Sequence, residues 1–448
     1  MKKALYGIGL FMAAGMLLSG CAGGEENAGE SEGVSDALEL SQDIAEDAGQ
    51  SGEESEMEDA GTQDIQAAEI ESGQETDITS PDALAFVEDM KIGWCLGNTF
   101  DAIDYGGLSD ELQYESCWCN AVTTKEMIDA LKEAGFRTIR IPVSWHNHLT
   151  SDTDSSVYAA NPEYVISKVW LDRVQEVVDY AIEDGLYVII NIHHDNSKEY
   201  IYPSSEYLEQ SKTYVTDIWR QIAERFKDYD EHLIMEGMNE PRLVGTANEW
   251  WLDLRKEECI DAVECINELN LAFVDTVRST GGQNAGRYLM VPGYAASLEG
   301  AVNPYFSLPE DIAGNQNRIL VSVHAYTPYA FALQAPGEGG STDSFDPQSA
   351  SSTGDIDNLM DTLYDTFIKN GTGVVIGEFG ARDKGGNTQA RADFSAYYVE
   401  AARARGITCC VWDNNAFTGD GENFGLFRRT SLQFLYPEIV ESLMSHCE

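Results

Sequence analysis

The chain has 448 residues and a formal net charge of −49 at pH 7, with a sequence pI near 4.2. So many acidic groups argue against nucleic acid as a partner and against direct binding to anionic lipid headgroups. The charge suits an exported protein that acts on a neutral molecule.

The first twenty residues have the pattern of an export signal. Two lysines precede an apolar run over residues 4–18, which is too short to span a bilayer comfortably. The run leads into Leu-Ser-Gly before Cys21, and a small-residue cleavage site that leaves Cys at the new N-terminus resembles the lipobox of bacterial lipoproteins. This resemblance implies a signal peptide over residues 1–20, a lipid on Cys21, and an extracellular protein tethered to the cell surface only by that lipid. Simple secretion is the alternative.

Residues 21–80 are predicted to form a disordered acidic linker. From Ala22 to Ser80 the chain has 19 Asp or Glu residues and no Lys, Arg or aromatic residue. Such a segment cannot bury enough apolar surface to offset its ordering entropy, and its like charges keep it extended. We therefore expect a stalk that holds a folded domain away from the cell surface.

The remaining residues, 81–448, are predicted to form one domain, because this aromatic-rich segment of about 370 residues has no Pro- or Ser-rich break. Eight cysteines lie in it, and a domain of this size does not require disulfides. Their connectivity is left open, although three that lie in apolar runs are interpreted as core thiols. The absence of CxxC pairs argues against a zinc site. The eight are Cys95, Cys117, Cys119, Cys259, Cys265, Cys409, Cys410 and Cys447.

Eight short apolar runs alternate with longer amphipathic segments along this domain. The runs are continuously apolar, as expected of parallel strands that are buried on both faces. Gly135 and Gly185 each follow a helical pattern, at the position of a helix C-terminal glycine. The predicted strands are 92–96, 138–143, 186–192, 233–238, 288–291, 319–323, 374–376 and 407–412, and the clearest helical patterns are 124–134, 165–184, 214–226 and 358–368. Eight such repeats predict an α/β fold, a single (β/α)8 barrel.

Polar and aromatic residues follow nearly every predicted strand, and the chemistry of such barrels lies at the carboxyl ends of the strands. Glu240 and Glu378 each end an apolar run beside turn-forming residues. Paired carboxylates at strand ends are the apparatus of glycosidic bond cleavage. The other strand-end residues, in chain order, are Asn98, Arg140, Trp145, His146, His193, His194, Asp195, Asn239, Tyr294, His324, Tyr326, Trp412, Asp413 and Asn414.

This ordered set resembles glycoside hydrolase family 5, the large family of retaining cellulases. The segments 96–101, 141–146 and 323–329 look like its subfamily 4, which comprises endo-β-1,4-glucanases, xyloglucanases and mixed-linkage glucanases. The resemblance extends from about Met90 to Leu443. It implies an endo-acting hydrolase that cleaves internal β-1,4 bonds of cellulose, mixed-linkage glucan or xyloglucan by double displacement, with no cofactor and no metal. The partner would be the glucan itself, and we expect a monomer.

By that resemblance Glu240 is the general acid/base and Glu378 is the nucleophile. Arg140 would favour the charged form of Glu378, and Tyr326 could donate a hydrogen bond to it. Glu240 must begin protonated, so its pKa is expected to be raised by burial or by the second carboxylate.

Further substrate-binding roles follow from the same resemblance. Asn239 would bind the sugar 2-hydroxyl, and Trp412 would stack on a sugar ring. His324 would contact the acid/base. His193 and His194 would line the non-reducing side of the cut, and Asn98 belongs to the same substrate-binding set. His146 is interpreted as a candidate substrate contact.

A metal site at His193-His194-Asp195 is not expected, because adjacent histidines on a strand point to opposite faces and cannot easily share one ion. Aromatic residues in the loops after the strands indicate an open cleft that binds a chain internally: Tyr105, Trp118, Trp250, Trp251, Tyr329 and Phe331. The alternatives are a non-catalytic glycan-binding lipoprotein on the same barrel, a β-mannanase, and a metal-dependent amidohydrolase.

Overall fold

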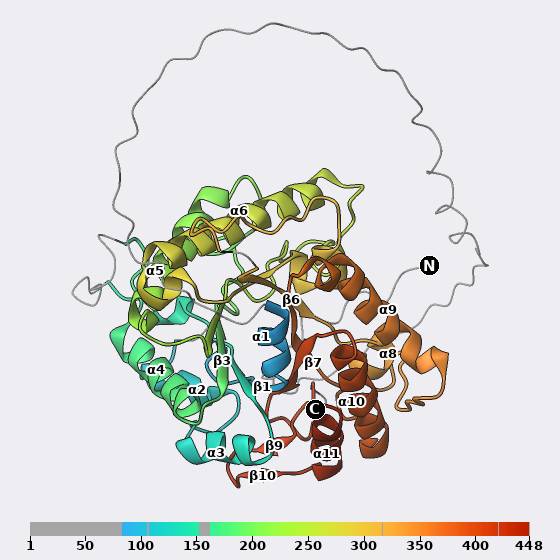
Figure 1. Cartoon of the computed structure of the whole chain (residues 1–448). Helices are drawn as coiled ribbons and strands as arrows, with labels where there is room; N and C mark the ends of the chain where they lie inside the picture. Colours follow the sequence, from blue (N-terminus) through green and yellow to red (C-terminus); the bar gives the residue numbers. More distant parts are fainter. Residues whose placement is uncertain (1–82, 105–106, 152–161, 316, 420, 448) are drawn as a thin grey trace, which may run out of the picture. The chain divides into compact units, whose positions relative to one another are not determined.

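The computed structural model describes residues 83–104, 107–151, 162–315, 317–419 and 421–447. The predicted signal peptide, Cys21 and the acidic linker lie outside these residues. Eight parallel strands pair in chain order and β8 pairs with β1, so the sheet closes into a barrel (Figure 1). The predicted (β/α)8 fold is confirmed. The strands are β1 (Ile92–Leu96), β2 (Thr138–Ile141), β3 (Tyr187–Asn191), β4 (Leu233–Glu236), β5 (Leu289–Pro292), β6 (Ile319–His324), β7 (Val374–Phe379) and β8 (Thr408–Asp413).

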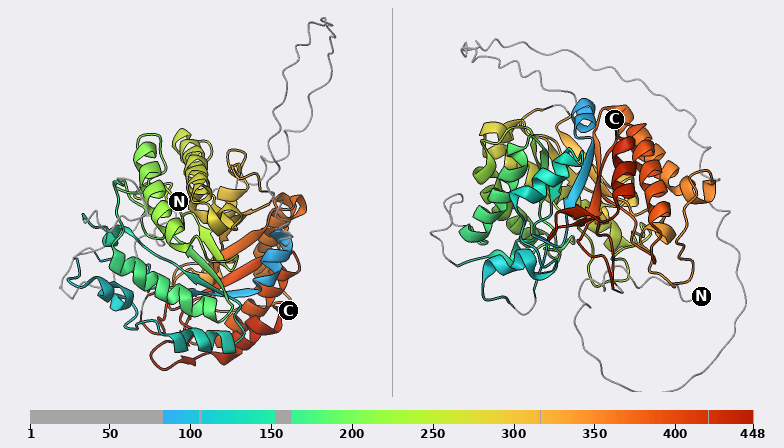
Figure 2. Two further views of the ribbon diagram at one scale, coloured as in Figure 1. Left: turned by 60° about the vertical axis from the view of Figure 1, so that its left-hand side comes forward. Right: turned by 90° about the horizontal axis from the view of Figure 1, so that it is seen from below.

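Helices surround the barrel (Figure 2). Their apolar residues are buried in one core together with residues of the strands. Every residue of the eight barrel strands is buried, as the continuous apolar runs predicted. The longer helices are α3 (Lys125–Glu133), α4 (Lys168–Glu183), α5 (Leu208–Phe226), α6 (Glu257–Ser279), α9 (Ala350–Thr366), α10 (Thr388–Arg403) and α11 (Pro437–Ser445). Short helical turns are α2 (Tyr114–Cys117), α7 (Leu298–Ala301) and α8 (Tyr329–Ala332).

The predicted helices are present, but two of them start earlier than their sequence patterns indicate. Helix α9 begins at Ala350, eight residues before the predicted start, although its first turns contain Ser and Gly. These residues have weak helix propensity, and the buried side chains of Thr353 and Ile356 show that packing against the domain supports this part of the helix. Gly135 and Gly185 adopt positive φ angles of 107° and 71°, as expected of helix C-terminal glycines.

Helix α1 (Ala83–Asp89) packs at the N-terminal end of the barrel and lies at its centre in Figure 1. Phe86 is 1% exposed and stacks on Tyr288, with ring centroids 3.7 Å apart, while its edge meets Tyr187. Tyr187 begins β3 and Tyr288 directly precedes β5, so both mark the amino ends of strands. The burial of Phe86 contributes about 2 kcal/mol. With this end packed, the carboxyl ends of the strands are the face where a substrate can enter.

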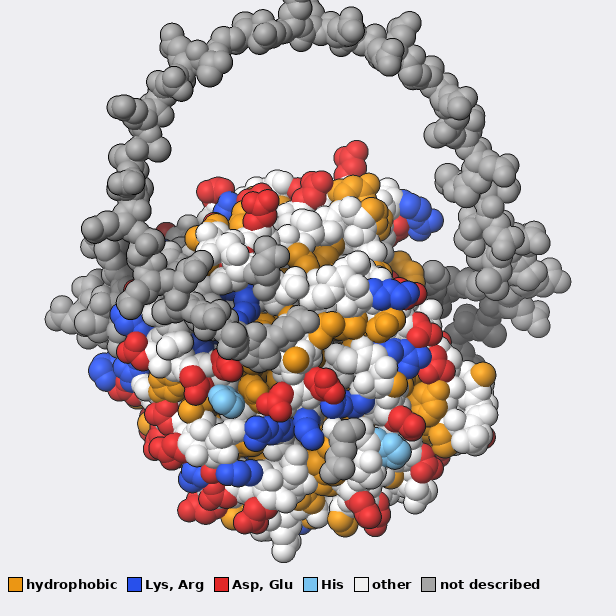
Figure 3. Space-filling view, in the orientation of Figure 1, with side chains coloured by type: hydrophobic (Ala, Val, Ile, Leu, Met, Phe, Trp, Pro, Cys, Tyr) orange, Lys and Arg blue, Asp and Glu red, His pale blue; other side chains and the backbone are white. Residues whose placement is uncertain are grey.

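Acidic and basic side chains intermingle over the face of the barrel seen in Figure 3. Among the described residues, no helix combines the length and the apolar character that crossing a membrane needs. The eight cysteines of the described residues form no disulfide with one another, and Cys95, Cys409 and Cys410 are buried core thiols, as predicted.

Candidate active site

Glu240 and Glu378 come together at the carboxyl ends of β4 and β7. Three atoms lie within 4.8 Å of one another: one carboxylate oxygen of Glu240, one of Glu378, and a ring nitrogen of His324. All three side chains line a cleft of about 380 Å³. Glu240 lies four residues beyond the end of β4, whereas Glu378 lies inside β7, so the two carboxylates reach the same space from non-adjacent strands.

Arg140 on β2 connects the residues beneath this cleft. Its Nη1 donates to Glu378 Oε1 (2.7 Å), its Nε to Glu236 Oε2 (2.8 Å), and its Nη2 to Asn239 Oδ1 (2.7 Å). Burial alone would lower the pKa of Arg140, but the two carboxylates outweigh it and raise that pKa above its ordinary value. The fully buried guanidinium therefore remains charged and orients three functional groups at once.

Glu236 is a site residue that the sequence analysis missed. Its buried carboxylate accepts hydrogen bonds from Arg140, from the Asn191 amide (2.9 Å) and from Ser322 Oγ (2.5 Å). Burial would raise the pKa of Glu236, but Arg140 outweighs it, with smaller contributions from His324 and Ser322, and lowers it to about 2. A charged residue inside the apolar run 233–238 was the available signal, because such a residue needs a buried partner.

Tyr326 completes the surroundings of Glu378. Its hydroxyl donates to Glu378 Oε2 at 2.8 Å, opposite the bond from Arg140 to Oε1. Burial raises the pKa of Tyr326 well above its usual value, and the charge of Glu378 raises it further, so the phenol keeps its proton. Both oxygens of Glu378 are thus engaged by donors that favour a fixed carboxylate.

The expected rise in the pKa of Glu240 is wrong. Burial does act to raise it, but the 2.9 Å hydrogen bond from His324 Nδ1 and the charges of His324 and Arg242 outweigh burial and lower the pKa. Burial also lowers the pKa of His324, yet the carboxylates of Glu378, Glu236 and Glu240 raise it to about 9 against the opposing effect of Arg140. In this arrangement the proton shared by the pair resides on His324.

Gly377 makes the approach of His324 to this cluster geometrically feasible. A Cβ atom on Gly377 would lie 3.0 Å from His324 Nε2, 3.2 Å from its Cδ2 and 3.4 Å from Glu236 Oε1. The register between β6 and β7 shifts at this point, and His324 pairs with Glu378. The glycine and the shift together let β7 present Glu378 while His324 packs over the preceding residue.

Asn239, His193, His194 and Trp412 also line the cleft, as predicted from the resemblance. Because Arg140 occupies the carbonyl oxygen of Asn239, its amide NH2 group is available to donate. The Asn191 amide lies 3.2 Å from His193 Nδ1, and burial holds the pKa of His193 well below its usual value. Burial likewise lowers the pKa of His194, to about 4. Both histidines are therefore neutral.

The geometric argument against a shared ion at His193 and His194 is wrong. Strand β3 ends at Asn191, so the alternation of a strand does not govern these residues. Their ring centroids are 4.4 Å apart, and one ligand atom each from Asp101, His193 and His194 lie within 4.8 Å of one another. Asp101 is, however, already engaged by the backbone N–H groups of Asn98 and Thr99, at 3.0 and 2.6 Å, and closes the loop after β1.

Two predicted contacts lie outside the cleft lining. Asn98 adopts a positive φ of 56° beside Asp101, at the end of β1, and is not among the lining residues. His146 bonds Asp195 Oδ1 at 2.9 Å and is likewise not in the lining. His146 holds the buried carboxylate of Asp195, and its contact with substrate stays a prediction.

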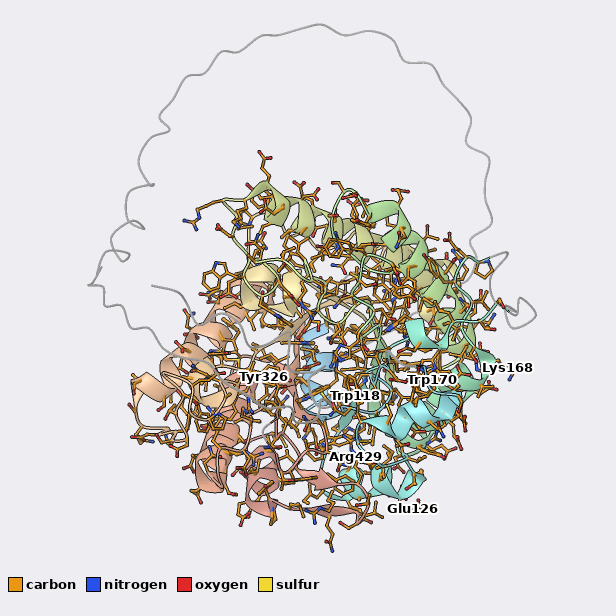
Figure 4. All side chains as sticks on the ribbon, turned by 180° about the vertical axis from the view of Figure 1, so that it is seen from behind. Trp118, Glu126, Lys168, Trp170, Tyr326 and Arg429 are labelled. Atoms are coloured by element: carbon orange, nitrogen blue, oxygen red, sulfur yellow. The ribbon has the colours of Figure 1, made fainter. Side chains whose placement is uncertain are left out.

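The loop aromatics divide into cleft and core residues. Trp118, Trp250 and Tyr329 line the cleft, and Figure 4 shows Trp118 and Tyr326 near the middle of the barrel. Phe331 is a core residue packed on Phe345 and Phe394. Trp251 is 59% exposed and is not in the lining, and Tyr105 lies outside the described residues. The lining also contains Asn196, which follows the third predicted strand, and residues that the sequence analysis did not single out, notably Arg242, Glu249 and Glu422.

Comparison with known proteins agrees with this geometry. Residues 104–418 match the family model described as cellulase (glycosyl hydrolase family 5). Endoglucanase 1 of Ruminococcus albus is 40% identical over 398 residues, which are 88% of each chain. A family 5 lichenase from Caldicellulosiruptor sp. F32, solved with cellotetraose, is 57% identical, with a TM-score of 0.79 over 86% of this chain and 100% of that one.

A further solved structure bears on the subfamily. It is a GH5-4 broad specificity endoglucanase from Ruminococcus champanellensis with bound cellotriose, 42% identical, with a TM-score of 0.73 over 82% of this chain and 100% of that one. The match to the family model and the identity to these relatives extend over most of the chain. The chain belongs to glycoside hydrolase family 5, and it is an endo-β-1,4-glucanase.

Proposed function

We propose that this endo-β-1,4-glucanase works by double displacement, with Glu378 as the nucleophile and Glu240 as the general acid/base. The observation that supports this proposal is the approach of the two carboxylates to within 4.8 Å. Retaining glycosidases hold their carboxyl groups about 5 Å apart, whereas inverting enzymes need about 6.5–9.5 Å to admit a water. The spacing favours direct attack by one carboxylate on the sugar.

In the first step, a Glu378 oxygen attacks the anomeric carbon and the glycosidic C–O bond breaks. Glu240 delivers a proton to the departing oxygen, and that proton comes from the pair that it forms with His324. Arg140 and Tyr326 hold Glu378 in its attacking position through one bond to each oxygen. The product of this step is a glycosyl ester on Glu378 and a shortened glucan with a new non-reducing end.

In the second step, Glu240 is a carboxylate and removes a proton from a water molecule. The water oxygen attacks the anomeric carbon, and the bond to Glu378 breaks. The hydrogen bond from His324 favours the ionised form of Glu240 that this step requires. The configuration at the anomeric carbon is retained because it has been inverted twice.

The other lining residues would hold the sugar during both steps. The Asn239 amide is oriented by Arg140 so that it can donate to the 2-hydroxyl, a contact that strengthens in the oxocarbenium-like transition state. Trp412 offers an apolar ring face to the sugar bound on the non-reducing side, next to the neutral His193 and His194.

The proposed substrates are β-glucans with internal β-1,4 bonds, namely mixed-linkage glucan, xyloglucan and cellulose. Support comes from the relatives, which are a lichenase with cellotetraose and a broad specificity endoglucanase with cellotriose. β-Mannan is the weaker candidate.

The test compares the wild-type protein with Glu378→Ala and Glu240→Ala on barley β-glucan, carboxymethylcellulose, xyloglucan and mannan. Both variants should release almost no reducing ends. With an activated cellobioside as substrate, azide should restore the activity of Glu378→Ala and give a glycosyl azide of inverted configuration. An azide product of retained configuration from that variant would contradict the nucleophile assignment. A wild type that binds a glucan without cleaving it would instead indicate the non-catalytic binding protein.

We also propose that a lipid on Cys21 anchors the enzyme to the outer face of the cell, with residues 21–80 as its stalk. The proposal rests on the lipobox-like pattern before Cys21 and on the acidic composition that follows it.

A further inference from the structure

Arg242 lies two residues after Glu240 and contacts it twice. Its Nη1 donates to the backbone carbonyl of Glu240 at 2.8 Å and lies 3.7 Å from Glu240 Oε2. The Arg242 side chain is only 12% exposed and lines the cleft. A guanidinium in this place fixes the main chain of the acid/base and puts a positive charge beside its carboxylate.

Two neighbours clamp Arg242 in this position. Its guanidinium carbon lies 3.9 Å from the centroid of the Trp250 ring, and its Nε lies 3.4 Å from Glu249 Oε1. Glu249 is itself held, because its Oε2 accepts a 3.0 Å bond from the backbone N–H of Gly245. The stacked and paired guanidinium has little freedom to swing away from Glu240.

The position in the cleft indicates which part of the substrate lies next to this clamp. Glu240 protonates the oxygen of the departing chain in the proposed mechanism, so residues on its outer side surround the departing sugar. Arg242 contacts Glu240 directly, and Glu249 and Trp250 hold Arg242 in turn. Arg242 therefore lies beside the residue that acts on the departing oxygen in the proposed mechanism.

Charged and titratable groups face Glu240 from every element around it. His324 at the end of β6 and Arg242 on the loop after β4 lower the pKa of Glu240, whereas Glu378 on β7 and Glu422 after β8 bring further carboxyl groups near it. Tyr326 after β6 and His194 after β3 also face it, and both are neutral. His324 serves three carboxylates, since it also lies 3.7 Å from Glu378 and 3.8 Å from Glu236. Arg242, by contrast, lies near only two carboxylates of the site, those of Glu240 and Glu249.

We propose that Arg242 is a positioning residue that holds the Glu240 carboxylate and favours its ionised form, so that Glu240 is ready to act as base in the second step. The inference rests on the proposed acid/base role of Glu240. A carboxylate with a cation 3.7 Å away gives up its proton more readily and takes a new one less readily. Removing the cation should therefore help the acid role at high pH and harm the base role at low pH.

The experiment measures pH profiles of Arg242→Gln in the full chain. With barley β-glucan, the alkaline limb of kcat/KM reports loss of the proton from the pair that Glu240 forms with His324 and should move upward by about one pH unit. With 2,4-dinitrophenyl cellobioside, whose leaving group needs no proton, kcat reports the second step, and its acid limb should move upward by a similar amount. Shifts of similar size in both limbs show that Arg242 acts on the Glu240–His324 pair in both steps.

Two further variants separate charge from structure. Arg242→Lys keeps the charge but not the planar stack on Trp250. Both limbs of its pH profiles should stay within about 0.3 pH unit of the wild type. Arg255→Gln removes the same charge from the same loop at a side chain that is 88% exposed, and it should leave both profiles unchanged. A lower kcat in Arg242→Gln with unmoved limbs would overturn the inference and leave Arg242 with a purely structural role.

Glu240→Gln, measured in parallel, distinguishes failure of this inference from failure of the proposed mechanism. It should lose glucan hydrolysis and keep the first step on the dinitrophenyl substrate, seen as a burst of dinitrophenol. If Glu240→Gln hydrolyses glucan like the wild type, the acid/base assignment fails. If it behaves as expected while Arg242→Gln shows unmoved limbs, only the role of Arg242 is rejected.

Discussion

At the scale of single residues, the charge balance under the cleft depends on Glu236 as much as on the two carboxylates that face the substrate. Arg140 is fully buried and bonds Glu236 on one side and Glu378 on the other. A buried guanidinium is tolerated only when its charge is compensated and its donors are satisfied. Glu236 is the partner that does not depend on the reaction, because Glu378 forms an ester during turnover.

The substitution Glu236→Gln tests this balance. It leaves Arg140 buried with one compensating carboxylate instead of two, and we expect the free energy of unfolding to fall by about 3 kcal/mol. Equilibrium unfolding in guanidinium chloride measures the loss. The control is Glu268→Gln, which breaks an ion pair with Lys212 at a side chain that is 52% exposed and should cost at most about 1 kcal/mol. A loss no larger than that of the control would contradict the structural role of Glu236.

At the scale of the strand, β7 supplies Glu378 and also makes room for the group beside it. The space above Gly377 is occupied by the His324 ring, so β6 and β7 can present a histidine and a glutamate to the same cleft. The sequence Gly-Glu at this strand end reads as a turn signal, yet Gly377 lies inside β7. The close approach of a ring from β6 is what requires a residue without a side chain here.

Gly377→Ala should therefore push His324 away from Glu240 by a few tenths of an ångström and lower kcat on barley β-glucan by about tenfold or more, because small displacements of catalytic groups are costly. Steady-state kinetics measure the loss, and thermal unfolding shows whether the fold survives. Gly354→Ala is the matched control, because its Cβ would meet no atom within 4 Å and α9 would gain helix propensity. Equal activity of the two variants would show that His324 tolerates the extra methyl group.

At the scale of the whole molecule, we propose that the barrel carries out the chemistry and that the segment before it carries the anchor. The described residues contain the catalytic machinery, and the acidic residues 21–80 precede them in the chain. A diacylated cysteine anchors a protein because each buried CH2 group contributes about 0.8 kcal/mol and two chains make the binding stable.

Cys21→Ala should accordingly move the enzyme from the membrane fraction of expressing bacteria to the soluble fraction or the medium. Fractionation followed by activity per mole of enzyme measures both location and function, and kcat should be unchanged because Cys21 takes no part in the proposed chemistry. Cys117→Ala, which alters an exposed cysteine of the barrel, is the control and should stay with the membrane. A wild type already found in the medium would favour simple secretion.

The sequence by itself determined the fold and the location of the chemistry. Continuous apolar runs that alternate with amphipathic segments specify strands buried on both faces, and eight such repeats close a barrel. Glu240 and Glu378 could be found because each follows an apolar run, and a strand end is a local property of the chain. The family resemblance then assigned the neighbours Asn239, His193 and Trp412, and the structure places all three in the cleft.

Only the tertiary structure decided how charge and protons are shared in the site. Arg140 and Glu236 are 96 residues apart, and their pairing exists only once β2 and β4 lie in one closed barrel. The pKa shift of Glu240 results from its burial and from charges on several strands, so the direction of this shift could not be predicted from the residues next to it in the sequence. The contact of His193 with His194 had the same origin, because it depends on where β3 ends in space.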